Sequence, residues 1–209
     1  MQPEAIRKYW LDLNQRCGCP PPVAWHGIDR LMMQYSTFGR HYHNLEHLAD
    51  LLTLQHQYSP QIVDNESLLY AIYFHDCIYL PKRRDNELKS AEEALFYLRK
   101  ANAPAERQDK VYRYILATAG HQPELSDPDL DYFLDFDLCV LAAPPERYKL
   151  YAKNIRREYR MFSWLEYRNG RVKVLQHFLS MPHIYRTELF RDQYELRARE
   201  NLERELEKL

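Results

Sequence analysis

Two short segments of the chain hold the side chains best suited to chemistry. Residues 40–47 read Arg-His-Tyr-His-Asn-Leu-Glu-His, and residues 74–76 read Phe-His-Asp. Imidazole and carboxylate groups together suit a divalent transition metal, and such a cation lowers the pKa of bound water enough to supply a nucleophile near neutral pH. The two segments therefore predict a metal centre with hydrolytic chemistry.

Helical periodicity indicates which of these side chains face the interior. A helix predicted from about Asn44 to Tyr58 puts His47 on its apolar face, because apolar residues follow it at intervals of three and four. A helix predicted from about Asn65 to Ile78 puts His75 and Asp76 on its buried side in the same way. A buried Asp must be paired or bound to a cation, which favours the metal interpretation.

A third carboxylate comes from the acidic, apolar segment 127–143. At ~100° per residue, a helix here places Asp137 in the middle of the apolar face and Asp135 nearly opposite. Asp137 is therefore the predicted inward carboxylate. Asp135 remains its rival, because the phase of the helix depends on where the helix begins.

Periodic segments of helical length fill the rest of the chain, and only 5 Gly interrupt them. A turn is expected at Asn169-Gly170. The fold class is all-α, and the length favours one domain over residues 1–209, with the metal-site helices at about 40–143 and C-terminal helices at about 146–209 packing on it. The further helices are predicted at 3–16, 24–35, 85–101, 104–121, 146–162, 172–180 and 187–209.

Charge and composition limit the classes of binding partner that we expect. Lys and Arg number 29 against 30 Asp and Glu, so no excess of positive charge favours a polymeric nucleic acid or an anionic membrane. No apolar run approaches the ~20 residues of a membrane helix. The four cysteines form no CxxC pair and the first residues lack a signal-peptide pattern, which predicts a cytoplasmic protein. It is expected to be a monomer, or a homodimer through its amphipathic last helix.

The order of these groups, His47, then His75-Asp76, then Asp137, resembles the HD superfamily of metal-dependent phosphohydrolases. The segments RHYHNLEH, FHDCIYLPKRRDNELKSAEEA, ILATAGH and DFDLCVLA resemble its small single-domain branch, and the likeness extends over nearly the whole chain. The resemblance implies an HD-type helical bundle in which these four residues bind one or two divalent ions, with Asp76 as the bridge between two. It leaves Mn, Mg, Fe, Ni, Co and Zn all open.

A second resemblance concerns His43. The spacing Tyr42-His43-Asn44-x-x-His47 is similar to the motif of class I cyclic-nucleotide phosphodiesterases, and implies that His43 protonates the leaving oxygen while His47 binds metal. Residues 77–81, Cys-Ile-Tyr-Leu-Pro, lack the second histidine of that family. They also lack the Glu-Asp that follows in the ppGpp hydrolases, so neither specific substrate is implied.

Several residues near the two segments could act on a phosphate group. Arg40 could grip it bidentately, and the cations at 82–84 follow the His-Asp pair closely. His121 could bind a second metal or a phosphate oxygen. The full predicted set beyond the metal ligands is Arg40, Lys82, Arg83, Arg84 and His121 for substrate, with Asp85 and Glu87 orienting ligands or water.

The function predicted from the sequence is therefore a metal-dependent phosphohydrolase of a small phosphate ester, preferably a nucleotide, with His43, Asp76 and Arg40 in catalysis. Two other interpretations keep the fold. One is a di-iron oxygenase that uses the same ligands plus His121. The other is a non-catalytic nucleotide-sensing module.

Overall fold

The computed structural model describes residues 1–121 and 127–209, and within these ranges it is helical without a β-strand. The all-α prediction is confirmed. The chain divides into two compact units, Met1–Phe133 and Leu134–Leu209, which are described separately. Two compact units can belong to one domain or to two, so the single-domain assignment remains a prediction. No helix in the described part is long and apolar enough to cross a bilayer.

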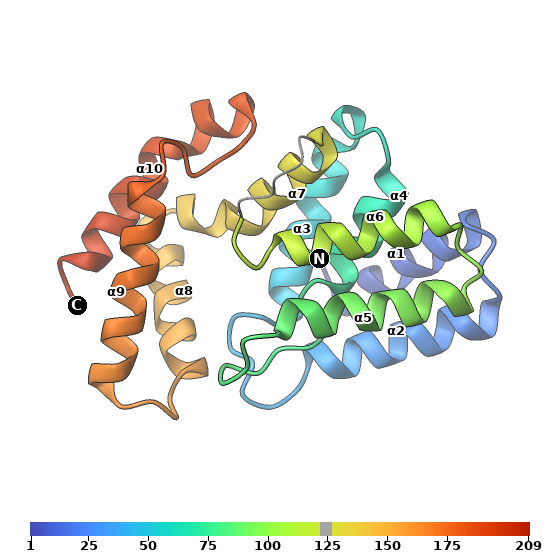
Figure 1. The fold of residues 1–209 in the computed structure, drawn as a ribbon, viewed down its shortest axis with the longest axis horizontal. Coiled ribbons are helices and arrows are strands. Elements are labelled where there is room, and N and C mark those ends of the chain that lie inside the picture. Colours follow the sequence, from blue (N-terminus) through green and yellow to red (C-terminus); the bar gives the residue numbers. More distant parts are fainter. Residues whose placement is uncertain (122–126) are drawn as a thin grey trace. The chain divides into compact units, whose positions relative to one another are not determined.

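Figure 1 shows the helices of each unit, with longer loops at 36–44 and 75–85 in the first unit. The first unit holds α1 (Pro3–Arg16), α2 (Pro21–Tyr35), α3 (Leu45–Tyr58), the short η1 (Ser59–Gln61), α4 (Asn65–Phe74), α5 (Asn86–Lys100), α6 (Ala105–Ala117) and the start of α7 (Pro128–Leu138). The second unit holds the last turn of α7, then η2 (Cys139–Ala142), α8 (Pro145–Glu158), α9 (Trp164–Ser180) and α10 (Glu188–Leu206).

Helix α4 is the centre of the first unit. Every residue from Ser67 to Phe74 is buried, as expected of a helix that is apolar on all sides. Its aromatic residues surround Trp10 of α1, whose Nε1 donates a hydrogen bond of 2.8 Å to the Ala24 carbonyl. A helix enclosed in this way delivers the residues at its C-terminus into the interior of the unit.

Helices α2 and α5 approach each other closely at Gly27. A Cβ at this position would lie 2.4 Å from Cε2 of Tyr97 and 3.0 Å from Cζ2 of Trp10. Only glycine allows this distance, because real Cβ atoms do not come so near to another ring. Helix α5 in turn runs beside α6 (Figure 1).

Several predicted helix boundaries are wrong. The helices predicted to reach His121 and Phe162 end at Ala117 and Glu158. The helix predicted to reach Ile78 ends at Phe74, so the His-Asp pair lies in the turn that follows it. The turn predicted at Asn169-Gly170 is absent, because α9 begins earlier. The Ser163 side chain accepts from the Glu166 N–H, and the Glu166 carboxylate accepts from the Ser163 N–H, which forms a capping box that starts the helix at Trp164.

The second unit is organised by α10. The Nδ2 of Asn201, a buried side chain, donates to the carbonyls of Leu141 and Ala143 and so fastens η2 to the helix. The Arg171 guanidinium of α9 makes two hydrogen bonds, of 2.8 and 2.9 Å, to the Glu205 carboxylate. Paired in this way, two charges can be buried at little cost.

Candidate metal centre

The first predicted segment is held in place by Asn44. This residue is the N-cap of α3, and its Oδ1 accepts hydrogen bonds from the N–H groups of Glu46 and His47. Such a cap satisfies donors that the first turn of a helix leaves without partners. His47 therefore sits in the first turn of α3 with only 3% of its surface exposed.

The second segment forms a tight turn after α4. The His75 N–H still donates to Ala71 as in a helix, whereas the Cys77 N–H donates to Phe74, three residues back. Beyond Cys77, side chains form the hydrogen bonds to the backbone groups. Ser90 Oγ bonds both the N–H and the carbonyl of Ile78. The helix predicted to continue stops here because its backbone has found these other partners.

Three potential ligand atoms converge between the segments. Nε2 of His47 lies 3.1 Å from Nε2 of His75, and Oδ2 of Asp76 lies 3.7 and 3.3 Å from these two nitrogens. The imidazoles of His47 and His75 belong to a group of side chains that could hold a metal ion. Both imidazoles are buried, so water could not readily displace an ion bound between them.

The tautomer of His75 suits a metal. Its Nδ1 lies 2.9 Å from the carbonyl of Ile72, which can only accept a hydrogen bond. Nδ1 therefore carries the proton, and in the neutral ring the lone pair of Nε2 points toward His47 and Asp76. Metal-binding histidines are typically oriented by a bond of this kind from the other ring nitrogen.

The carboxyl group of Asp76 is strongly acidic in this setting. Burial alone would raise its pKa, but the positive charges that His75, His43 and His47 carry when protonated outweigh burial and hold the pKa below its usual value. The group is therefore a carboxylate over the whole neutral range, as a metal ligand must be.

Arg40 joins the two segments to each other. Its Nη1 donates to the carbonyls of His43 and Asp76, and its Nη2 donates to the carbonyl of Cys77 at 2.8 Å. Its guanidinium also lies near the rings of Tyr35 and Tyr79. The structure thus gives Arg40 a positioning task that the sequence had not suggested. Its predicted substrate-binding role remains a prediction.

His43, the predicted acid, lies beside the ligand group. Its ring stacks on that of Tyr79 with the centroids 4.0 Å apart, and its centroid is 5.9 Å from that of His47. His43 is half-buried, so its ring is held in place without being closed off from the surface. Its influence on the pKa of Asp76 is a second sign that it faces this site.

The two aspartates of α7 have different surroundings. Asp135 is fully buried, contrary to its predicted place opposite the apolar face. Its carboxylate accepts hydrogen bonds from the N–H groups of Arg186 and Thr187 and from the Thr187 hydroxyl, at the start of α10. Its oxygens are therefore already engaged within the second unit. Asp137 lies one helical turn after Phe133, whose ring meets that of His75 edge-on.

The loop after the His-Asp pair is held by residues that the sequence had not singled out. Asn86 bonds the N–H and the carbonyl of Leu80 through its side-chain amide, and Ser90, one turn further along α5, holds Ile78. Asp85 and Glu87 flank Asn86. The Asp85 carboxylate accepts two hydrogen bonds from Arg83 and does not cap α5.

The remaining predicted residues lie near the surface. Lys82 and Arg84 are exposed in the loop before α5, and Glu87 is half-buried in its first turn. His121 follows the end of α6 in the left-handed region, with φ of 53°. The substrate-binding and ligand-orienting roles of these residues remain predictions.

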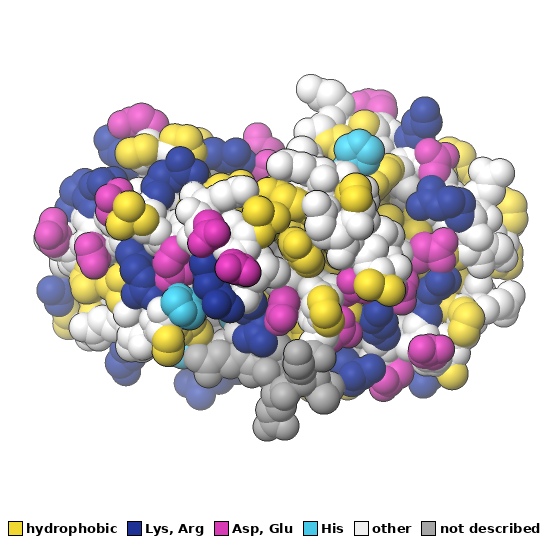
Figure 2. Space-filling model, turned by 90° about the horizontal axis from the view of Figure 1, so that it is seen from above, with side chains coloured by type: hydrophobic (Ala, Val, Ile, Leu, Met, Phe, Trp, Pro, Cys, Tyr) yellow, Lys and Arg dark blue, Asp and Glu magenta, His cyan; other side chains and the backbone are white. Residues whose placement is uncertain are grey.

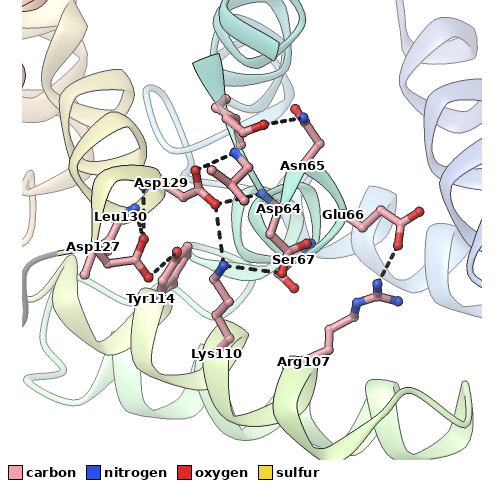
Figure 3. A network of polar contacts seen from close by, with 12 residues as sticks. Asp64, Asn65, Glu66, Ser67, Arg107, Lys110, Tyr114, Asp127, Asp129 and Leu130 are labelled. Carbon is pink, nitrogen blue, oxygen red and sulfur yellow. Dashed lines mark hydrogen bonds and ion pairs between the residues drawn. The ribbon is translucent and has the colours of Figure 1, made fainter. Parts of the chain in front are cut away.

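A polar network anchors the other end of α4 (Figure 3). The buried Asp129 carboxylate accepts hydrogen bonds of 2.8 Å from the N–H groups of Val63 and Asp64. Asp64 caps α4 through the Ser67 N–H, and the Lys110 ammonium lies within 3.5 Å of both carboxylates. The start of α4 is thereby attached to α6 and α7, which keeps the His-Asp turn at its far end in position.

No protein-family model, curated protein or solved structure matches the chain.

Proposed function

We propose that this protein is a metal-dependent phosphohydrolase that cleaves a small, nucleotide-like phosphate ester. The observation that carries the proposal is the convergence of the two Nε2 atoms and the Asp76 carboxylate within 3.7 Å of one another. The proton position on His75 and the acidity of Asp76 support it, because both leave ligand atoms ready for a cation. The order His, His-Asp, Asp resembles the HD superfamily and agrees with it.

We assign His47, His75, Asp76 and Asp137 as the ligands. Asp137 is included because the helical pattern of its own segment predicts it as the inward carboxylate and because the order His, His-Asp, Asp resembles that of the HD superfamily. A divalent cation bound here would lower the pKa of water and so supply the nucleophile. Imidazole and carboxylate ligands together fit Mn, Fe, Co, Ni or Zn better than a site made of oxygen ligands would.

The chain's own residues would bind and protonate the substrate. His43, beside the ligand group, would protonate the departing oxygen, and its stacking on Tyr79 would keep the ring at the angle this requires. Arg40 has a buried Nε with no hydrogen-bond partner among the described residues. Buried donors rarely lack an acceptor, and a phosphate oxygen would provide one.

The substrate class follows from charge. Lys82 and Arg84 are exposed cations in the loop directly after the metal segment and would meet the phosphate of a small ester. A polymeric nucleic acid would need a broad basic surface. On the face drawn in Figure 2, basic and acidic side chains are intermixed, which supports a small substrate over a polyanion.

The test is hydrolysis by the purified full chain supplied with Mn²⁺. We expect release of phosphate or nucleoside from a member of a panel of nucleotides, and loss of that release in Asp76→Ala and in the more conservative Asp76→Asn. Asp109→Ala is the matched control, because this exposed aspartate forms an ion pair with Arg113 on its own helix. Unfolding curves confirm that each variant folds. Activity that persists in both Asp76 variants would refute the proposal.

The metal content of the protein as purified separates the alternatives. Two irons per chain with absorbance in the visible region would favour the oxygenase. Tight nucleotide binding without turnover, with several different metals, would favour the sensing module.

A further inference from the structure

A pocket of about 240 Å³ lies between α2 and α5 in the first unit, and none of the proposed metal ligands belongs to its lining. Its buried lining includes Leu31, Phe74 and Tyr97, and its exposed lining includes His26, Phe96 and Lys100. Phe74 precedes His75 directly.

The inner part of the pocket would hold an apolar body. Leucine and aromatic rings form its wall, and side chains of these types usually line small-molecule sites. A cavity of about 150 Å³ is enough to hold benzene, so a pocket of this size has room for a body somewhat larger than one ring. A flat, fused two-ring group fits this description, since it could also stack on the exposed ring of Phe96.

The mouth of the pocket favours an anion. Arg30 and Glu93 form an ion pair across it, with Nε and Oε1 2.6 Å apart, and so cancel each other. Lys100 has no such partner. Its ammonium lies 4.3 Å from the centre of the Phe96 ring, and no carboxylate among the described residues pairs with it. A ligand that stacks on Phe96 would bring its own charge next to this cation.

We propose that this pocket binds a small aromatic carboxylate, with the ring system against Leu31, Phe74 and Tyr97 and the carboxylate on Lys100. The site is independent of the proposed hydrolase activity. It would bind a different class of small molecule from the proposed phosphate ester.

The test is calorimetric titration of the metal-free full chain with 2-naphthoate, in the presence of a chelator so that the carboxylate cannot bind a metal. We expect saturable binding to one site with a Kd of about 1 mM or tighter, given the usual affinity per atom of ligands this size. The uncharged analogue 2-naphthylmethanol should bind about three- to fivefold more weakly, as an exposed charge pair is worth little more. Absence of saturable naphthoate binding would refute the proposal.

Two variants locate the ligand. Lys100→Met should remove the preference for naphthoate over the alcohol, whereas Arg99→Met, which removes an exposed cation one residue away outside the pocket, should leave it unchanged. Phe96→Ser should weaken both ligands, and its exposed position makes a folding defect easy to exclude by thermal unfolding. The assignment would be overturned if Lys100→Met and Arg99→Met lost the preference for naphthoate equally. It would also be overturned if Phe96→Ser bound both ligands as tightly as the unaltered protein. Binding unchanged in Asp76→Asn would separate this site from the proposed metal centre.

Discussion

The Nε2 atoms of His47 and His75 lie 3.1 Å apart, although 28 residues separate the two in sequence. The His75 lone pair points at this contact, so two neutral rings that both carried their proton on Nδ1 would repel each other. A proton or a cation between them relieves this repulsion. We therefore expect the proposed metal binding to be coupled to folding most directly at this pair.

Metal binding should stabilise the fold through this pair. At a free Mn²⁺ concentration of 100 times Kd, we expect the free energy of unfolding to rise by about 2.7 kcal/mol, and a chelator to reverse the gain. His47→Ala and His75→Ala should lose the gain, whereas His183→Ala, an exposed histidine, should keep it. Thermal unfolding with and without Mn²⁺ measures this. An equal Mn²⁺-dependent gain in the free energy of unfolding in all three variants would show that the metal binds elsewhere.

Arg40→Lys should weaken the fold and the metal centre together. Lysine cannot reach the carbonyls of His43, Asp76 and Cys77 at once, so we expect a loss of about 2–3 kcal/mol in the free energy of unfolding. Mn²⁺ affinity, measured without substrate, should fall as well. If Arg40 acted only on the phosphate, the variant would raise KM and leave both of these quantities unchanged.

Asp129→Asn should destabilise the first unit. Both carboxylate oxygens accept backbone N–H groups, and the amide replaces one acceptor with a donor that faces a donor. We expect a loss of about 1–3 kcal/mol in the free energy of unfolding by denaturant titration. Asp109→Asn, at an exposed helical ion pair, is the control and should change stability by less than about 0.5 kcal/mol.

Stability should fall in acid, in part through Asp64. Burial would raise the pKa of this carboxyl, but hydrogen bonds from Ser67 and the charge of Lys110 lower it below the ordinary value. A pKa that is lower in the folded state gives stability that is present above the unfolded-state pKa and is lost as the pH falls through the folded-state pKa. Below about pH 4, near the ordinary pKa of an aspartate in the unfolded chain, Asp64→Asn should flatten the fall in the free energy of unfolding. If the free energy of unfolding of Asp64→Asn fell with pH as steeply as that of the unaltered protein, Asp64 would not be the source of this acid sensitivity.

Gly27→Ala and Gly170→Ala should have opposite effects. A Cβ at Gly27 meets the Tyr97 ring, and overpacking of this kind costs about 1–3 kcal/mol. Gly170 lies inside α9 with nothing within 4 Å of an added Cβ, so alanine there should stabilise the protein by up to about 1 kcal/mol. Thermal unfolding of the two variants compares them directly. Stabilisation by both substitutions would show that α2 and α5 lie further apart than described.

Much of the fold could be predicted because its signals are local. Apolar residues at helical spacing indicated α1 at its observed limits and α3 to within one residue. The burial of His47 followed from the same spacing. One local signal, at Asn169-Gly170, was misread as a turn. A stronger local signal, the four-residue capping box from Ser163 to Glu166, lies a few positions earlier.

The site depended on tertiary contacts that no local pattern contains. Amino-acid types and spacing determined by themselves that the chain is helical and that imidazole and carboxylate groups gather in residues 40–47 and 75–76. Only the tertiary structure decided that Arg40 bonds three carbonyls, that Asn86 rather than Asp85 holds the loop, and that Asp135 is buried against Arg186 and Thr187. The physical reason is that helical periodicity specifies the direction of a side chain, whereas its hydrogen-bond partner is set by segments distant in sequence.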